Sequence, residues 1–171
     1  VELSGEGLFD VTHNPERPFI VEAGKTTMTV RGTKFNVRDF DDEGTASTTL
    51  LEGCVEVGNR SGTVTHAPGM QSRTRGAADA LSVREVDPTA YTAWTEDKIA
   101  FYNADLEEVL ADIRRWYRVE RQGNVDPAQY ALTGKIPREF SLAQVIDLLE
   151  TITDLELVMP DEKTLIVNKK Q

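Results

Sequence analysis

The second half of the chain repeats one helical pattern of apolar residues at a fixed interval, and this repeat restricts the possible folds more than any other feature. The first copy comprises Leu106, Val109, Leu110, Ile113 and Trp116, and the second comprises Leu142, Val145, Ile146, Leu149 and Ile152. Each position follows its counterpart by 36 residues (142 − 106, continuing to 152 − 116). Spacings of three and four residues place each set on one face of an α-helix. We therefore predict two amphipathic helices, each with a buried apolar face.

Start signals precede both predicted helices. Asp105 with Glu108, and Ser141 with Gln144, each fit a capping box, while Asn103 is a rival cap for the first helix. Burial of five large apolar side chains contributes roughly 8–15 kcal/mol per helix before entropy is counted. Because a cap contributes only about 1 kcal/mol, we expect the apolar faces to determine how the helices pack.

Strand-like runs flank each helix, and a further run closes the chain. They read KIAFY, YRVERQ, YALTGKI, LELVM and TLIVNK in chain order. We predict a βαβ-βαβ-β domain over residues 98–171, with two helices packed on small sheets. The closing run, residues 165–167, is expected to form an exposed sheet edge because nothing after it in the chain can cover it.

Residues 1–90 show short alternating runs separated by glycine, proline, asparagine and aspartate, which is typical of strands and turns. In the segment TVRGTKFNVRDF, the apolar alternation changes phase at Gly32-Thr33. A glycine at such a change predicts a β-bulge or a corner between packed sheets, and a ligand-binding loop is the alternative. The predicted fold class is α+β: an all-β sandwich or solenoid-like domain over 1–90, then the 98–171 domain, with a boundary within 86–94.

Charge and cysteine content exclude some classes of protein. The net charge is −10, and residues 1–90 (9 basic, 14 acidic) and 91–171 (10 basic, 15 acidic) each carry −5. No basic stripe is therefore available for nucleic acid. Cys54 is the only cysteine, so no intrachain disulfide or cysteine cluster can form. Neither a membrane span nor a signal peptide is visible, and we expect the chain to be a piece of a longer protein.

Candidate catalytic and metal-binding residues are few. His13 lies in a predicted turn, and His66 continues a strand; neither has a nearby companion of the kind that a metal site needs. We expect both histidines to be structural residues with satisfied ring nitrogens, or to be exposed. No motif of a hydrolase nucleophile or a phosphate-binding loop is present. The sequence therefore predicts no cofactor, no metal and no enzymatic activity.

Two clusters of side chains could bind a partner. Trp94, Phe101, Tyr102, Trp116 and Tyr117 could form a sugar platform, although such residues more often pack a domain junction. Arg114, Arg115, Arg118 and Arg121 form a local basic concentration near the end of the first helix. Arginines there favour the helix dipole in any case, and an acidic partner is the alternative reading.

Several segments resemble the FecR family of membrane-anchored anti-sigma regulators. In the first half these are LSGEGLFDVTHNPERPFIVEAG, VRGTKFNV, LLEGCVEV and APGMQ. In the second half they are FYNADLEEVLADIRRWYRVE, TGKIPREFSLAQVIDLLETITDLEL and TLIVNKK, which resemble the domain that follows in these proteins. That domain is similar to the short N-terminal domain of secretins and TonB-dependent transducers. Gly7 replaces a more usual alanine, and Asp97 stands where the resemblance leads us to expect glycine.

The resemblance implies the periplasmic signal-receiving region of an inner-membrane regulator in a Gram-negative envelope. In such proteins an outer-membrane TonB-dependent transducer sends the signal through its periplasmic signalling domain. A cytoplasmic N-terminal segment holds an extracytoplasmic-function sigma factor, and one helix crosses the membrane. Both segments are expected to lie upstream of this chain, together with further strands of the first domain.

The residues expected to contact the transducer are Arg114, Arg115, Arg118 and Arg121, and the strand Leu165, Ile166 and Val167. A periplasmic carbohydrate-binding module is the alternative function, supported by the all-β half and the aromatic residues.

Overall fold

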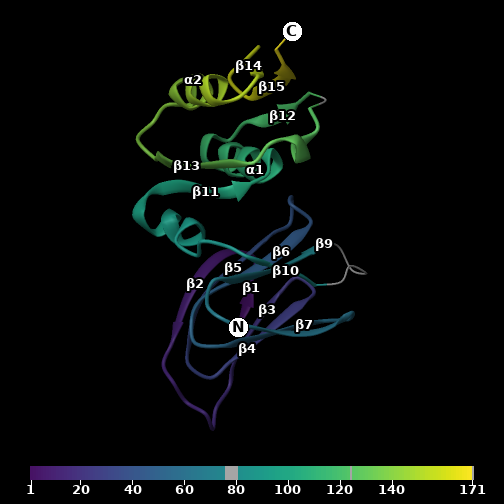
Figure 1. The fold of residues 1–171 in the computed structure, drawn as a ribbon, viewed down its shortest axis with the longest axis vertical. Coiled ribbons are helices and arrows are strands. Elements are labelled where there is room, and N and C mark those ends of the chain that lie inside the picture. Colours follow the sequence, from purple (N-terminus) through teal and green to yellow (C-terminus); the bar gives the residue numbers. More distant parts are fainter. Residues whose placement is uncertain (76–80, 124, 171) are drawn as a thin grey trace. The chain divides into compact units, whose positions relative to one another are not determined.

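The protein has an α+β fold that divides into two compact units, Val1–Thr92 and Ala93–Gln171. A computed structural model describes residues 1–75, 81–123 and 125–170 (Figure 1). The predicted fold class is confirmed. A 3₁₀-helix that the sequence did not predict, η1 (Ala90–Glu96), spans the division between the units. Among the described helices, none has the length and apolar content needed to cross a membrane.

Unit 1 is a sandwich of two five-stranded sheets. The first sheet has the order β1 (Glu2–Leu3), β3 (Phe19–Ala23), β4 (Thr26–Val30), β7 (Val55–Asn59) and β8 (Gly62–His66). The second has the order β10 (Ser82–Glu85), β9 (Met70–Arg75), β6 (Thr45–Glu52), β5 (Thr33–Phe40) and β2 (Gly5–Val11). Both sheets contribute buried residues to one core: Val21, Ala23, Met28, Val30, Phe35, Val37, Leu50, Val55 and Val57.

The phase change at Gly32 is a corner between the two sheets, as predicted. Strand β4 lies in the first sheet and β5 in the second, so the apolar residues before and after the corner enter the core from opposite sides. Gly32 has a φ of 147°, and a Cβ there would lie 2.6 Å from the Cα of His13. Gly53 turns the chain back from β6 to β7 with a φ of 88°. A Cβ on Gly53 would lie 2.6 Å from the Gly32 carbonyl oxygen, so the two corners touch and both require glycine.

Unit 2 contains the two predicted helices and two small sheets. The elements are β11 (Lys98–Ala104), α1 (Leu106–Tyr117), β12 (Glu120–Gln122), η2 (Pro127–Gln129), β13 (Leu132–Pro137), α2 (Leu142–Ile152), β14 (Leu155–Val158) and β15 (Thr164–Lys169). Strands β11 and β13 pair antiparallel, and the other sheet has the order β12-β15-β14. Side chains from both helices and both sheets form one core.

The helix starts agree with the predicted caps. Asp105, not Asn103, caps α1, because its side chain accepts a hydrogen bond from the Glu108 amide at 2.9 Å. Ser141 and Gln144 form the complete capping box of α2. Asp97, where the resemblance led us to expect glycine, has a φ of 56°. Glycine adopts this left-handed conformation at least cost, and aspartate tolerates it better than most residues.

Two sequence predictions about unit 2 are wrong. Strand β15 is not an edge, because it lies between β12, to which it is parallel, and β14, to which it is antiparallel. Its Leu165 and Val167 side chains are fully buried in the core. Ile152, which we expected to be buried, is 54% exposed. It is the last residue of α2, and the chain turns into an extended conformation at the C-cap Thr153.

Truncation of Leu149 should destabilise unit 2. Its side chain is 2% exposed within the core, so Leu149→Ala should cost about 2–5 kcal/mol of unfolding free energy. Hydrogen exchange should show lost protection mainly beyond residue 98. Leu50→Ala, which truncates a fully buried residue of unit 1, is the matched control and should reduce protection in unit 1 instead. Equal loss of protection across both units in both variants would contradict the presence of two separate cores.

His66 is a buried titratable residue at the end of β8. It is 2% exposed, and neither ring nitrogen has a hydrogen-bond partner among the described residues. The prediction that this histidine is satisfied or exposed is wrong, because it is buried and both of its ring nitrogens are unsatisfied among the described residues. Burial lowers the pKa of His66 below its usual 6.5. The folded protein therefore favours the neutral ring.

This burial should make unit 1 less stable in mild acid. Below a pH of about 6.5 the unfolded chain binds a proton at this histidine that the folded chain resists binding, so stability falls as pH falls. Between pH 7.5 and 5.5, the wild-type chain should lose about 1 kcal/mol more unfolding free energy than His66→Gln, measured by urea denaturation. His13→Gln, which changes an exposed histidine, should behave as wild type. An identical pH dependence in wild type and His66→Gln would refute the assignment.

Candidate functional site

The predicted basic concentration lies where α1 ends and β12 begins. We call Arg114, Arg115, Arg118 and Arg121 the arginine cluster. Arg114 and Arg115 occupy the last turn of α1, where positive charge favours the helix dipole. Arg118 is the C-cap, with a left-handed φ of 56°, and its amide donates to the Arg114 carbonyl oxygen. Arg121 follows on β12. The structure thus brings the four arginines into one region of unit 2.

Acidic side chains neutralise two members of the arginine cluster. Arg114 forms an ion pair with Glu120 at 3.2 Å. Arg121 forms an ion pair with Glu107 from the first turn of α1, and its Nη2 also donates to the Val125 carbonyl oxygen at 3.3 Å. Arg118 is exposed and makes no side-chain bond to any residue that the structure describes. Arg118 is therefore the clearest candidate in the cluster for contact with a partner.

A further arginine, which was not among the residues predicted from the sequence, lies on unit 2. The Arg138 guanidinium stacks over the Trp116 ring at 4.9 Å from its centroid. It also donates to Asp97 at 3.0 Å, and both side chains of this ion pair are well exposed. Residues 97 and 138 lie too far apart in the sequence for a local pattern to indicate this contact. It forms because β11 and β13, which these residues flank, are paired.

The aromatic residues, for which the sequence favoured packing and left a sugar platform as the alternative, do not all lie at the surface of unit 2. Phe101 is buried, whereas its neighbour Tyr102 is 45% exposed on the opposite face of β11. Tyr117 packs against the core and donates its hydroxyl hydrogen to the Phe140 carbonyl oxygen at 2.8 Å. Burial raises the pKa of Tyr117. Phe101 and Tyr117 thus serve packing, and the buried Phe101 cannot take part in an exposed sugar-binding surface.

The described residues hold no cluster of metal ligands. In residues 1–75, 81–123 and 125–170, no three histidine, cysteine, aspartate or glutamate side chains lie close enough to hold a metal ion. A depression of about 760 Å³ is lined by Glu156, Asn168, Lys169 and Lys170. Its lysines already have partners, because Lys169 pairs with Asp154 at 3.2 Å and Lys170 donates to the Glu150 carbonyl oxygen at 2.6 Å.

The carboxylate of Asp154 also belongs to a hydrogen-bonded pair with a tyrosine. The Tyr130 hydroxyl donates to Asp154 at 2.6 Å. This hydrogen bond raises the pKa of Tyr130 to about 12 and, together with Lys169, lowers the pKa of Asp154. A tyrosine that holds its proton this firmly is a poor acid, and the pair serves to connect η2 to the end of α2.

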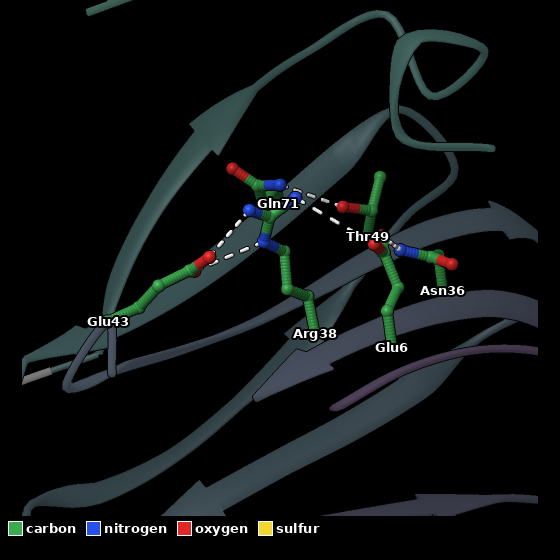
Figure 2. A network of polar contacts seen from close by, with 6 residues as sticks. All are labelled: Glu6, Asn36, Arg38, Glu43, Thr49 and Gln71. Carbon is green, nitrogen blue, oxygen red and sulfur yellow. Dashed lines mark hydrogen bonds and ion pairs between the residues drawn. The ribbon is translucent and has the colours of Figure 1, made fainter. Parts of the chain in front are cut away.

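A polar network, which was not predicted from the sequence, runs across the second sheet of unit 1 (Figure 2). On β5, Asn36 donates to Glu6 at 2.8 Å, and Arg38 donates to Glu43 at 2.6 and 3.1 Å. Gln71 donates to Thr49 at 2.8 Å. Alternation along β5 directs these side chains away from the core that Phe35 and Val37 enter.

The network continues to the last strand of this sheet. Arg84 on β10 donates to the Gln71 side-chain oxygen and to the Tyr91 hydroxyl, each at 2.9 Å. Asn36, Thr49 and Gln71 are nearly fully buried. Because each buried polar group in this network has a hydrogen-bond partner, the network stabilises the sheet and resembles neither a catalytic pair nor a metal site. The polar residues of β5, which alternate with Phe35 and Val37, were the only local sequence signal for this network.

Comparison with solved structures shows which proteins share this fold. The chain matches two crystal structures of a candidate anti-sigma factor from Parabacteroides distasonis, determined at 1.65 and 2.50 Å. In the first, the TM-score is 0.86 with 22% identity, over 99% of this chain and 80% of the other. In the second, the TM-score is 0.83 with 22% identity, over 99% and 79%. At this identity the likeness concerns the fold. No curated protein sequence matches this chain.

Family models identify both units. Residues 1–56 match the FecR protein model, and residues 98–167 match the model of the FecR C-terminal region. The first match covers the strands from β1 to the start of β7, and the second covers the repeat with both helices. The two matches follow each other along the chain in the same order as the segments that resemble this family. The chain therefore belongs to the FecR family of regulators.

Proposed function

We propose that this chain is the periplasmic signal-receiving region of a membrane-anchored anti-sigma regulator. In this proposal it relays a signal from an outer-membrane TonB-dependent transducer to an extracytoplasmic-function sigma factor. The observation that carries the proposal is the succession of the two FecR-family matches along the chain. The likeness to a candidate anti-sigma factor supports it at the level of the fold. Contact with the sigma factor and with the membrane belongs to other parts of such a regulator.

The character of the site favours a regulator over an enzyme. Unit 2 offers charged and backbone groups at its surface, and the described residues hold no metal-ligand cluster. A net charge of −10 disfavours nucleic acid as the partner. The carbohydrate-binding alternative needs an exposed aromatic platform, and burial of Phe101 removes one of its five candidate residues. Protein–protein recognition through unit 2 is the function that the geometry supports best.

Transducer binding should be confined to unit 2. We expect a fragment of residues 93–171 to bind the purified signalling domain of the cognate transducer with nearly the affinity of the whole chain. A fragment of residues 1–92 should not bind. Isothermal titration of the three proteins tests this, and circular dichroism with thermal unfolding confirms that each fragment is folded. Binding by residues 1–92 alone would move the site to unit 1, and absence of binding by the whole chain would refute the proposed partner.

Two substitutions of Arg118 separate the effect of its charge from the effect of its backbone conformation. Arg118→Gly should raise the stability of unit 2 by about 0.5–1 kcal/mol, because glycine relieves the left-handed conformation at the C-cap. Loss of the charge should also slow association with an acidic partner at low salt. Arg118→Ala is the matched control, since it removes the same charge but keeps a Cβ. It should slow association equally without the gain in stability.

Stopped-flow association rates at two salt concentrations, with thermal unfolding of each variant, provide the measurement. If both variants associate at the wild-type rate in low salt, Arg118 does not steer the partner.

A further inference from the structure

Unit 2 is built from sheets of two and three strands, so it has strand edges that could pair with another chain. The outer strands are β11 and β13 in one sheet, and β12 and β14 in the other. An unpaired edge presents backbone N–H and C=O groups to which an extended segment can add as a further strand. The four edges differ in whether these groups are still available.

The edge of β14 is already capped by side chains. The Leu157 amide donates to the Glu150 carboxylate at 2.7 Å, and the Leu155 amide donates to the Thr153 hydroxyl at 3.2 Å. Both acceptors come from the end of α2 and the turn after it. Side chains that occupy edge donors in this way prevent a further strand from pairing. Strand β14 is therefore closed to strand addition.

The edges of β12 and β11 are poorly suited for other reasons. Strand β12 has three residues, half the length of β13. Strand β11 carries an irregularity in its pairing between Phe101 and Ala104, where Asn103 adopts a left-handed φ of 47°. A bulge of this kind twists an edge and interrupts regular pairing.

The edge of β13 is regular, and its pairing with β11 determines which of its backbone groups point outward. Just beyond the strand ends, the Arg138 amide donates to the Asp97 carbonyl oxygen at 2.9 Å. Hydrogen-bonded pairs in an antiparallel ladder recur every second residue, so Ile136 and Gly134 bond to β11. Lys135, between them, must direct its N–H and C=O away from β11. Pro137, which has no N–H, also occupies an outward phase, as this assignment requires.

The outward groups of β13 are accessible. Thr133, Gly134 and Lys135 are all exposed, and a Cβ on Gly134 would meet no heavy atom within 4 Å. Outside the β11–β13 ladder, no described residue bonds to the backbone N–H or C=O of Lys135. Pro137 limits the edge at its far end, because an incoming strand would find no donor there.

Charge on the open face of this sheet indicates the character of the incoming segment. Ile99, Phe101 and Ile136 face the core, so alternation places Lys98 and Lys135 on the opposite face. Lys98 is paired with Glu96 at 2.9 Å. Lys135 has no ion pair within 4 Å among the described residues, although, in addition to the hydrogen bond from Lys98, its charge helps to lower the pKa of Glu96. An acidic side chain on an added strand, directly beside Lys135, would form a favourable cross-strand pair.

We propose that β13 is the docking edge of unit 2, at which an extended segment of the transducer's signalling domain adds a third strand beside residues 133–135. Backbone bonds to Lys135 hold the segment, and an acidic residue beside the Lys135 side chain selects it. This inference rests on the proposed function and specifies where the partner binds. It replaces β15, which the sequence analysis favoured and which lies inside its sheet.

One substitution separates the backbone of Lys135 from its side chain. Lys135→Pro removes the outward N–H and adds a ring at the edge, while the ladder bonds of Gly134 and Ile136 to β11 are kept. Lys135→Ala is the matched control that keeps the amide. The whole chain is titrated with the purified signalling domain of the cognate transducer. Lys135→Pro should weaken binding by about tenfold or more. Lys135→Ala should weaken it by less than about threefold.

Hydrogen exchange of the wild-type chain provides a test that does not depend on the fold of a variant. The Lys135 amide should exchange fast in the free chain and become protected when the signalling domain is bound. The Leu157 amide, capped by Glu150, should change little and serves as the internal control.

The outcomes distinguish the inference from the function on which it rests. Wild-type binding that Lys135→Pro leaves unchanged, with the Lys135 amide unprotected in the complex, would overturn the docking edge alone. Equal losses in Lys135→Pro and Lys135→Ala would also overturn it, because the side chain and not the backbone would then carry binding. No binding by the wild-type chain would overturn the proposed function itself.

Discussion

Unit 2 depends on the burial of two helical apolar faces between two small sheets. Neither α1 nor α2 is long enough to be stable alone in water. Their buried residues, together with those of both sheets, form one core. Because each sheet has two or three strands, a large part of the strand backbone lies at edges. The same construction that buries the helices therefore leaves backbone groups available for recognition.

The elements of this unit could be predicted from local pattern, but the order of its strands could not. The 36-residue repeat gave both helices, which begin at Leu106 and Leu142 as expected. Alternation in β15 shows that Leu165 and Val167 share a buried face, but a central strand and an edge strand can have this same pattern. The position of β15 is set by its pairing with β12, whose residues lie more than forty positions earlier. No local signal reports a pairing at that distance.

The net charge of the candidate site could not be predicted from local sequence either. A count of arginines near the end of α1 indicates a strongly basic patch, yet Glu107 and Glu120 neutralise Arg121 and Arg114. The Arg121 pair joins residues fourteen positions apart, outside the three- and four-residue spacings by which helical sequences are read. By contrast, the corner at Gly32 was predictable, because the change of apolar phase and the glycine occur at the same place.

The added strand β15 makes the two halves of the repeat differ in what their edges can do. The first strands of the halves, β11 and β13, pair with each other, whereas the last strands, β12 and β14, are separated by β15 and lie on its two sides. Glu150 and Thr153 then cap β14, and the bulge near Asn103 interrupts β11. A repeat that began with equivalent strands thus retains one long, regular and exposed edge, β13. In a small domain with unavoidable edges, a capped edge, a bulged edge and a short edge leave the fourth edge as the best place for strand addition.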